Sequence, residues 1–293
     1  MKGAIIINAF FRPKESVRQA ERMQKEFAKN GVKTEIISDG FLRSALIGGK
    51  IKTEIDADFI LFLDKDKYLS AELEKTGFRL FNRHSAIRAC DDKGETYLKL
   101  SESGLNIPDT VFGALSYSAD DEIPEAFADR IINRLNLPLI VKESFGSMGK
   151  GVYKADDIGS LIKIMNELKN RPHIFQKIVG SNIGEDIRVI VIGGKAIAAM
   201  RRKNKNDFRS NVALGGKTEA VDLSEDFIYA AERAAKILSL DYCGVDILDD
   251  AGSPYICEVN SNAFFEGIEM TTGVNIAALY ADYIIKTVNK EKH

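Results

Sequence analysis

Apolar and polar positions alternate in blocks along the first part of the chain. Residues 2–9 and 58–64 form almost continuous apolar runs, typical of strands buried on both faces, and residues 33–39 form another strand between them. In residues 14–30 apolar side chains recur every three or four positions and stop at Gly31, which predicts an amphipathic helix followed by a glycine cap. Strand, helix and strand in this order predict a parallel βαβ unit.

The rest of the chain divides into two further blocks. A predicted helix at residues 83–103 leads into a block of mixed strands and helices, and long β segments dominate from residue 176 onward. The predicted strands are 109–113, 137–143, 173–177, 186–194, 195–202, 241–250 and 254–260, and the predicted helices are 123–135, 156–168, 224–239 and 274–289. Hairpin turns between the later strands predict an antiparallel sheet. We expect an α/β and α+β fold in three parts, residues 1–85, 86–175 and 176–293.

Composition and charge narrow the class of protein. The 293 residues are 45% hydrophobic, and 41 Lys and Arg against 43 Asp and Glu give a net charge of −2, so no basic excess favours nucleic-acid binding. No window approaches the about 18 apolar residues of a membrane span, and the start lacks a secretory signal, so we expect a cytoplasmic protein without membrane contact. Scattered Cys and His argue against a zinc site. The first turn, residues 8–13, lacks glycine, which argues against dinucleotide binding by this Rossmann-like unit.

A glycine-rich turn and nearby lysines point to an anion. Residues 146–151 read Gly-Ser-Met-Gly-Lys-Gly between two strands, which predicts a hairpin flap whose backbone N–H groups can close over phosphates; a plain hairpin tip is the alternative. Lys142 lies in the apolar strand before this turn, where an ammonium needs an anion or a route to water. Lys93 is a second candidate cation, although a solvated helix position also explains it. The segment 173–180 can offer backbone groups to an adenine edge, although most such segments are only strands.

Acidic and amide side chains on the last strands suggest a metal site. Glu258 and Asn260 are two apart on one strand and project to one face, and a turn places Asp246 on the neighbouring antiparallel strand. Three hard oxygen ligands suit Mg²⁺, which keeps its other positions for phosphate and water. A hairpin with a wet polar face is the alternative, which the apolar residues of the opposite face disfavour.

A local basic cluster includes Arg188, Arg201, Arg202 and Arg209. By itself the cluster fits either phosphate or nucleic acid. Phe208 alone supplies aromatic surface there, which is too little for a platform that stacks single-stranded bases. Guanidinium groups beside a phosphate and magnesium site neutralise the charge that develops during phosphoryl transfer, which is the simpler interpretation.

The candidate residues occur along the chain in an order that resembles the ATP-grasp superfamily, and more closely its RimK-like branch of α-L-glutamate ligases. They are Lys93, Lys142, the glycine-rich turn, Gln176, Arg188, Arg209, Asp246, Glu258 and Asn260. The diagnostic runs are EDIRVIVIGG, DFRSNVALGG, CGVDIL and EVNSNAFFEGIEMTTGVNIA. The resemblance, from about residue 82 onward, implies an ATP-grasp fold of two α+β subdomains after the Rossmann-like domain. The residues that it implies for ATP are Lys93, Lys142, Gly146, Ser147, Met148, Gly149, Gly151, Gln176, Lys177, Ile178, Val179, Asp186, Arg209, Ser210 and Asn211. It also implies Arg188 and Arg209 for catalysis, Asp246, Glu258 and Asn260 for metal, and Arg202 and Asn262 for substrate.

The activity that the resemblance implies is ATP-dependent ligation of a carboxylate to an amine through an acyl phosphate. The implied cofactors are ATP and a pair of Mg²⁺ ions, with Mn²⁺ as an alternative. The implied partners are an amino acid such as glutamate and a carboxylate-bearing acceptor, which can be a small molecule, a peptide or a protein C-terminus. A homo-oligomer is expected. An ATP-binding regulatory or scaffold protein without ligase turnover is the alternative.

Two departures from the branch limit what the resemblance transfers. Lys177 stands where the branch commonly has an acidic residue after the hinge Gln, so recognition of the adenine amino group by that side chain does not carry over. Residues 262–265 read Asn-Ala-Phe-Phe where relatives often have Ser-Pro-Gly. This segment is expected near the acceptor, so the identity of the substrate does not carry over either.

Overall fold

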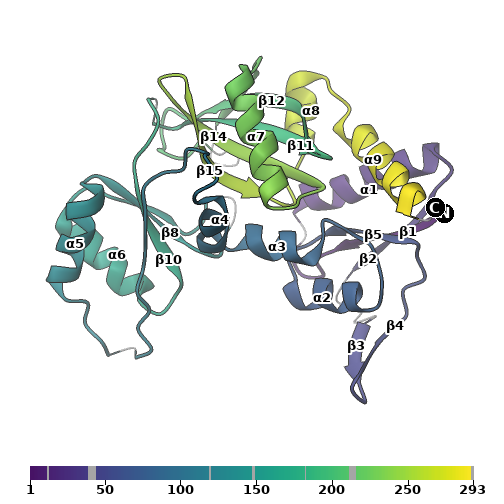
Figure 1. Ribbon diagram of the computed structural model, residues 1–293, viewed down its shortest axis with the longest axis horizontal. Helices are drawn as coiled ribbons and strands as arrows, with labels where there is room; N and C mark the ends of the chain where they lie inside the picture. Colours follow the sequence, from purple (N-terminus) through teal and green to yellow (C-terminus); the bar gives the residue numbers. More distant parts are fainter. Residues whose placement is uncertain are drawn as a thin grey trace.

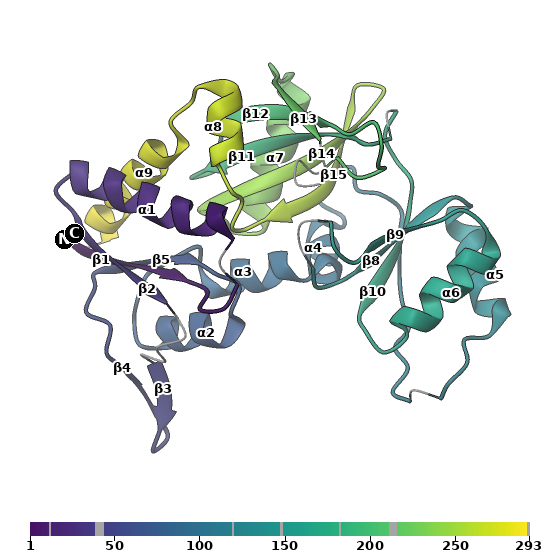
Figure 2. The same ribbon diagram turned by 180° about the vertical axis from the view of Figure 1, so that it is seen from behind.

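The protein is elongated, with a five-stranded sheet between two smaller α/β groups, as the computed structural model in Figure 1 shows. The structure describes residues 1–11, 13–38, 44–118, 120–146, 149–181, 183–210 and 216–291. Figure 2 shows the same arrangement from behind, with the N-terminal group at one end and a small four-stranded sheet at the other. Among the described residues, no helix is long and apolar enough to cross a membrane.

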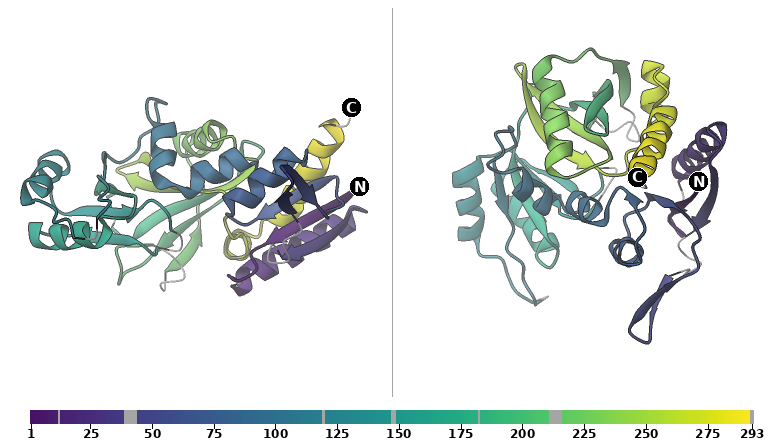
Figure 3. Two further views of the ribbon diagram at one scale, coloured as in Figure 1. Left: turned by 90° about the horizontal axis from the view of Figure 1, so that it is seen from below. Right: turned by 45° about the vertical axis from the view of Figure 1, so that its right-hand side comes forward.

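The N-terminal sheet is parallel, with strand order β2-β1-β5-β6. Its strands are β1 (Lys2–Ile7), β2 (Lys33–Ser38), β5 (Phe59–Leu63) and β6 (Leu80–Phe81), and the helices beside it are α1 (Lys14–Lys29) and α2 (Lys67–Lys75). Every position of β5 is buried, as is every position of β1 after Lys2, so the predicted βαβ unit is confirmed. The helix α2 and a protruding hairpin of β3 (Ser44–Ile47) and β4 (Lys50–Thr53) add to the predicted elements (Figure 3).

The helix predicted at residues 83–103 is wrong as a single element. It is divided into α3 (His84–Asp91) and α4 (Lys93–Leu100). Asp92 separates them because its backbone is extended, and its side chain accepts hydrogen bonds from the N–H groups of Gly94 and Glu95 as the cap of α4. The break places Lys93 at the first position of α4.

The small sheet is antiparallel, with strand order β7-β10-β8-β9. It contains β7 (Thr110–Phe112), β8 (Leu139–Glu143), β9 (Val152–Ala155) and β10 (His173–Lys177), covered by α5 (Glu125–Leu135) and α6 (Ile158–Leu168). Val141 and Phe175 face these helices in one apolar core. Because side chains alternate along a strand, Ile140, Lys142 and Gln176 face the other side, which the helices do not cover.

The C-terminal sheet has the order β13-β12-β11-β14-β15, and its pairs are antiparallel as predicted. Its strands are β11 (Glu185–Ile192), β12 (Lys195–Lys203), β13 (Lys217–Ala220), β14 (Tyr242–Asp250) and β15 (Ser253–Asn260), and the helices around it are α7 (Glu225–Ile237), α8 (Glu266–Thr272) and α9 (Ile276–Glu291). The strand β13 and the helix α8 add to the predicted elements. Apolar side chains of α7 pack on one face of the sheet together with residues of α3 and α4.

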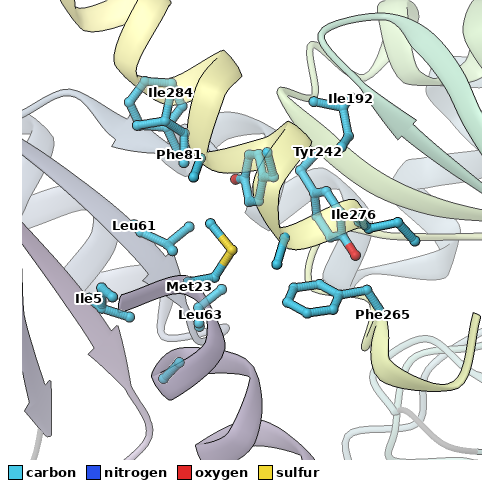
Figure 4. Packing of buried hydrophobic residues seen from close by; sticks show 14 of the residues in the cluster. Ile5, Met23, Leu61, Leu63, Phe81, Ile192, Tyr242, Phe265, Ile276 and Ile284 are labelled. Carbon is cyan, nitrogen blue, oxygen red and sulfur yellow. The ribbon is translucent and has the colours of Figure 1, made fainter. Parts of the chain in front are cut away.

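One apolar core joins the N-terminal and C-terminal parts. Met23 and Leu61 from the N-terminal part pack with Tyr242, Phe265 and Ile284 from the C-terminal part (Figure 4). The described cores therefore cross the predicted part boundaries, and the division itself stays a prediction.

Asn82 also ties these two parts together. Its side-chain amide donates to the carbonyls of Tyr242 and Ser261, each at 2.7 Å, and its Oδ1 accepts from the N–H groups of Asp241 and Tyr242. Asn82 is 2% exposed, so these four hydrogen bonds are made in the interior.

Candidate functional site

A pocket lies between the uncovered face of the small sheet and the C-terminal sheet. Its empty volume is about 1030 Å³, part of it open to solvent. The predicted site residues that line it are Lys93, Lys142, Gly149, Gln176, Lys177, Ile178, Val179, Asp186, Arg209, Ser210, Asp246 and Glu258. Gly146, Gly151, Arg188, Arg202, Asn260 and Asn262 do not line it, and Ser147, Met148 and Asn211 lie outside the described residues.

Strand register explains how the small sheet supplies one wall. Lys142 lies opposite Val152, and Ile140 lies opposite both Gln176 and Lys154, so these side chains share a face. All five line the pocket. Ile140, Val152 and Lys154 are additions to the predicted site, and the period-two alternation around Lys142 is the signal that identifies them.

Lys142 is a buried cation that makes no ion pair within 4.0 Å with a carboxylate in the described part of the chain. The residue is 8% exposed, and its Nζ lies 3.8 Å from Cys257 Sγ. Burial raises the pKa of the Cys257 thiol, which is therefore neutral at pH 7 and gives the ammonium no counter-charge. A buried ammonium that faces a pocket in this way is stabilised by an anionic ligand.

Lys93 joins the glycine flap to the acidic side of the pocket. Its Nζ donates to the carbonyl of Gly146 at 2.9 Å and lies 3.5 Å from Glu258 Oε1. Its backbone N–H donates to the carbonyl of Ser144 at 2.9 Å, so the start of α4 is held against the base of the flap. Gly151, with φ +70, closes the other side of the flap, where a side chain would be strained and would crowd Glu143.

Gln176 presents a buried acceptor to the pocket. Thr110 Oγ1 donates its proton to the carbonyl of Pro108 at 2.7 Å, so it must accept from Gln176 Nε2, 2.9 Å away. This contact fixes the orientation of the amide and leaves Oε1 as the free end. Gln176 is 1% exposed, and its Oε1 accepts no hydrogen bond from the described residues. A buried amide oxygen of this kind requires a hydrogen-bond donor as its partner.

Charged side chains form a stripe across the C-terminal sheet. Arg202 lies opposite Asp186, and two residues further along β11 Arg188 lies opposite Asp246, which lies opposite Glu258. These positions share the pocket face of the sheet because opposed residues, and residues two apart, point the same way. The predicted placement of Asp246 beside Glu258 is confirmed.

Within the stripe the side chains are tightly paired. Arg188 holds both oxygens of Asp246 at 2.7 Å, and Arg202 contacts Asp246 Oδ2 at 3.0 Å and both oxygens of Asp186. Ser210 donates its hydroxyl to Asp186. Burial acts to raise the pKa of Asp246, but Arg188 and Arg202 together hold that pKa below its ordinary value. Burial raises the pKa of Asp186 in spite of Arg202.

Two of the predicted substrate contacts lie away from the pocket. Arg202 is 3% exposed and paired beneath the lining, so its position gives no support to a contact with a substrate carboxylate. Asn262 Oδ1 accepts from Gln19 Nε2 at 3.2 Å and so faces the N-terminal part of the chain.

The predicted metal ligands fit a hard cation that takes further ligands from phosphate and water. Asp246 and Glu258 are adjacent across two strands, and Asn260 Nδ2 lies 3.5 Å from Asp246 Oδ2. In the described ranges, no group of three or more His, Cys, Asp and Glu is arranged for a metal. Two carboxylates and one amide leave open positions, which is the coordination that Mg²⁺ with a nucleotide uses.

Arg209 connects the flap to the loop before β13. Its Nη1 donates to the carbonyl of Gly149 at 2.9 Å, while Asp207 accepts from its Nε and Nη2 at 3.0 and 2.7 Å. Phe208 beside it also lines the pocket. The other residues that line the pocket have no predicted role, and they are Pro108, Lys150, Ile183, Gly184, Glu185, Leu248 and Cys257. Tertiary packing brings these residues to the pocket.

Comparisons with known proteins point to one family. The RimK-like ATP-grasp domain matches residues 91–284. Human β-citrylglutamate synthase B is 34% identical over 223 residues, which cover 75% of this chain and 56% of that protein. A probable α-L-glutamate ligase from Maridesulfovibrio salexigens is 34% identical over 224 residues, which cover 75% of this chain and 72% of that protein. The chain thus spans little more than half the length of the first of these relatives.

A solved structure shares the whole fold. The crystal structure of D-alanine–D-alanine ligase from Bacillus anthracis matches with a TM-score of 0.76 at 20% identity, covering 100% of both chains.

Proposed function

Because the chain belongs to the RimK-like ATP-grasp family, we propose that it is an ATP-dependent ligase that joins the carboxylate of one substrate to the amine of another. The ATP-grasp fold after a Rossmann-like domain, predicted from the motifs, is confirmed. The observation that carries the proposal is the pocket itself, in which the buried ammonium of Lys142 lies across from the carboxylates of Asp246 and Glu258. The same pocket thereby combines cations for phosphate with acids for a metal.

ATP fills this pocket in the proposed function. Lys93, Lys142 and the glycine flap bind the phosphates, and the hinge at residues 176–179 binds the adenine. Asp186, on the pocket lining, receives the ribose hydroxyls. Asp246, Glu258 and Asn260 hold Mg²⁺, for which Mn²⁺ substitutes. The metal supplies charge neutralisation at the phosphate oxygens.

The reaction needs no covalent bond to the enzyme. An acceptor carboxylate oxygen attacks the γ-phosphorus of ATP, the bond to ADP breaks, and an acyl phosphate forms. An amine then attacks the acyl carbon, phosphate leaves, and the proton lost by the amine ends on that phosphate. Arg188 and Arg209 stabilise the negative charge of the transferred group.

The proposed amine substrate is an amino acid of the glutamate type. Support comes from relatives whose names are β-citrylglutamate synthase, N-acetylaspartylglutamate synthase and α-L-glutamate ligase. The carboxylate substrate is a small molecule, a peptide or a protein C-terminus. We further propose a cytoplasmic homo-oligomer.

A substrate screen tests this function. The full chain is incubated with ATP, Mg²⁺, an amino acid and panels of carboxylates, and phosphate release is measured together with mass spectrometry for condensation products. Glu258→Gln is the control, because it keeps the side-chain shape and removes the charge. A positive result is phosphate release that needs both substrates and is lost in Glu258→Gln. Tight ATP binding without turnover across the panels would instead favour a regulatory or scaffold protein.

A further inference from the structure

The carboxylate of Asp246 is contacted on both oxygens by hydrogen-bond donors. Its Oδ1 accepts from Arg188 Nε at 2.7 Å. Its Oδ2 faces Arg188 Nη2 at 2.7 Å, Arg202 Nη2 at 3.0 Å and Asn260 Nδ2 at 3.5 Å. Each carboxylate oxygen offers two lone pairs, so Oδ2 is fully occupied, and Oδ1 keeps one lone pair beside the Arg188 guanidinium. A metal that binds Asp246 therefore competes with the two-point contact of Arg188, which holds both oxygens.

The two arginines differ in how firmly they are held. The Arg202 side chain is 3% exposed and bridges two carboxylates, those of Asp186 and Asp246. The Arg188 side chain is 18% exposed, and within the described residues Asp246 is its single ion-pair partner within 4.0 Å. Figure 2 shows the strands that carry these groups, β11 and β14, side by side at the sheet centre.

Removing Arg202 from Asp246 would carry the larger free-energy penalty. Its guanidinium would stay buried with half of its partners lost, and the two acidic groups that it separates would face each other. Breaking a buried ion pair from one side is strongly destabilising because it leaves an uncompensated charge. Arg188 can instead rotate toward solvent or toward an anion in the pocket, where its charge is compensated.

We propose that Arg202 is the fixed counter-ion that positions Asp186 and Asp246, and that Arg188 is an exchangeable one that a nucleotide-bound metal displaces from Asp246. This inference rests on the proposed function for the identity of the metal. The displaced guanidinium becomes available to the phosphoryl oxygens. Metal binding at Asp246 therefore controls whether Arg188 can contact the phosphoryl group. Arg202 is then a positioning residue, and Arg188 changes partners during the cycle.

Mn²⁺ binding to the intact protein, followed by electron paramagnetic resonance without turnover, tests the proposal. Arg188→Gln should bind Mn²⁺ about tenfold more tightly, because a competing cation is gone. Arg202→Gln should bind Mn²⁺ about tenfold or more weakly, because the ligand carboxylates lose their positioning partner. Arg202→Lys should restore binding only in part, since an ammonium lacks the planar fork of donors.

The matched control is Arg79→Gln. Arg79 is also a mostly buried arginine, with two contacts to Asp241 at 2.7 and 3.0 Å, but its partner Asp241, unlike Asp186 and Asp246, does not line the pocket. Its loss should lower the free energy of unfolding without changing the Mn²⁺ affinity. If both pocket variants tightened Mn²⁺ binding, a simple sum of charges would explain the data and the proposal would fail. Weaker binding by Arg188→Gln would also overturn it.

A second measurement covers the case in which Arg202→Gln does not fold. In the wild-type protein, the ¹⁵N signal of Arg188 Nε should shift on addition of Mg²⁺ and ADP, while that of Arg202 Nε stays in place. Movement of the Arg202 signal alone would contradict the assignment. Neither readout needs ligation, so a negative substrate screen with these outcomes would reject the proposed function and leave this inference intact.

Discussion

Lys142→Met should weaken nucleotide binding without weakening the fold. In the protein without ligand, the ammonium is 8% exposed, and its described contact is a neutral thiol 3.8 Å away. Replacing it with an apolar side chain of similar length removes a buried charge that has no ion-pair partner within 4.0 Å among the described residues, so the free energy of unfolding should change by less than about 1 kcal/mol. A charge-assisted contact to phosphate contributes about 1.5–3 kcal/mol, so the Kd for ADP should rise about 10- to 150-fold.

Calorimetric titration with ADP and urea unfolding without nucleotide measure the two effects on the same preparation. Adenosine, which has no phosphate, should bind wild type and Lys142→Met equally. Lys163→Met, at an exposed position of α6, is the matched control and should leave both quantities unchanged. If Lys142→Met lost unfolding free energy and kept its affinity for ADP, Lys142 would be a structural residue and the reasoning would be refuted.

Three further predictions concern base selection, stability and pH. Gln176→Leu removes the unpartnered acceptor Oε1, so the preference for ATP over GTP in competition binding should narrow by about 1–3 kcal/mol; an unchanged ratio would reject an adenine contact. Asn82→Ala removes four buried hydrogen bonds to backbone groups, and urea unfolding should show a loss of about 3 kcal/mol or more, whereas a loss below about 1 kcal/mol would contradict this account. Burial lowers the pKa of His173 below its usual 6.5, so stability present above about pH 6.5 should decline as the pH falls toward the folded pKa. His173→Gln should flatten that decline in thermal unfolding between about pH 5 and 7, and an unaltered slope would assign it to other groups.

Local patterns predicted those parts of the site in which neighbours in sequence are neighbours in space. Glu258 and Asn260 share a strand, and a short turn brings Asp246 opposite Glu258, so the acidic pair followed from side-chain alternation. Lys142 was identifiable because a lysine among apolar strand residues demands a partner. The buried βαβ strands were similarly readable from their continuous apolar runs.

Features that depend on distant partners escaped prediction. The register that pairs Arg202 with Asp186 and Arg188 with Asp246 is set by hairpins and by contacts across 58 residues of chain, so the position of Arg202 beneath the pocket could not be predicted from local patterns. The free acceptor of Gln176 depends on Thr110, 66 residues away. The predicted helix is divided at Asp92 because the aspartate side chain caps a new helix there. The apolar spacing continues across this position and therefore did not reveal the break.

Transfer of an oxygen atom from the carboxylate substrate to phosphate tests the central claim most directly. Once the screen provides a substrate pair, the carboxylate is labelled with ¹⁸O, and the phosphate released with the condensation product is examined by mass spectrometry. Attack of the carboxylate on the γ-phosphorus predicts that each released phosphate carries one oxygen from the carboxylate and that ADP forms in equal amount. Unlabelled phosphate, or release of AMP and pyrophosphate, would contradict an acyl phosphate and with it the proposed ligase mechanism.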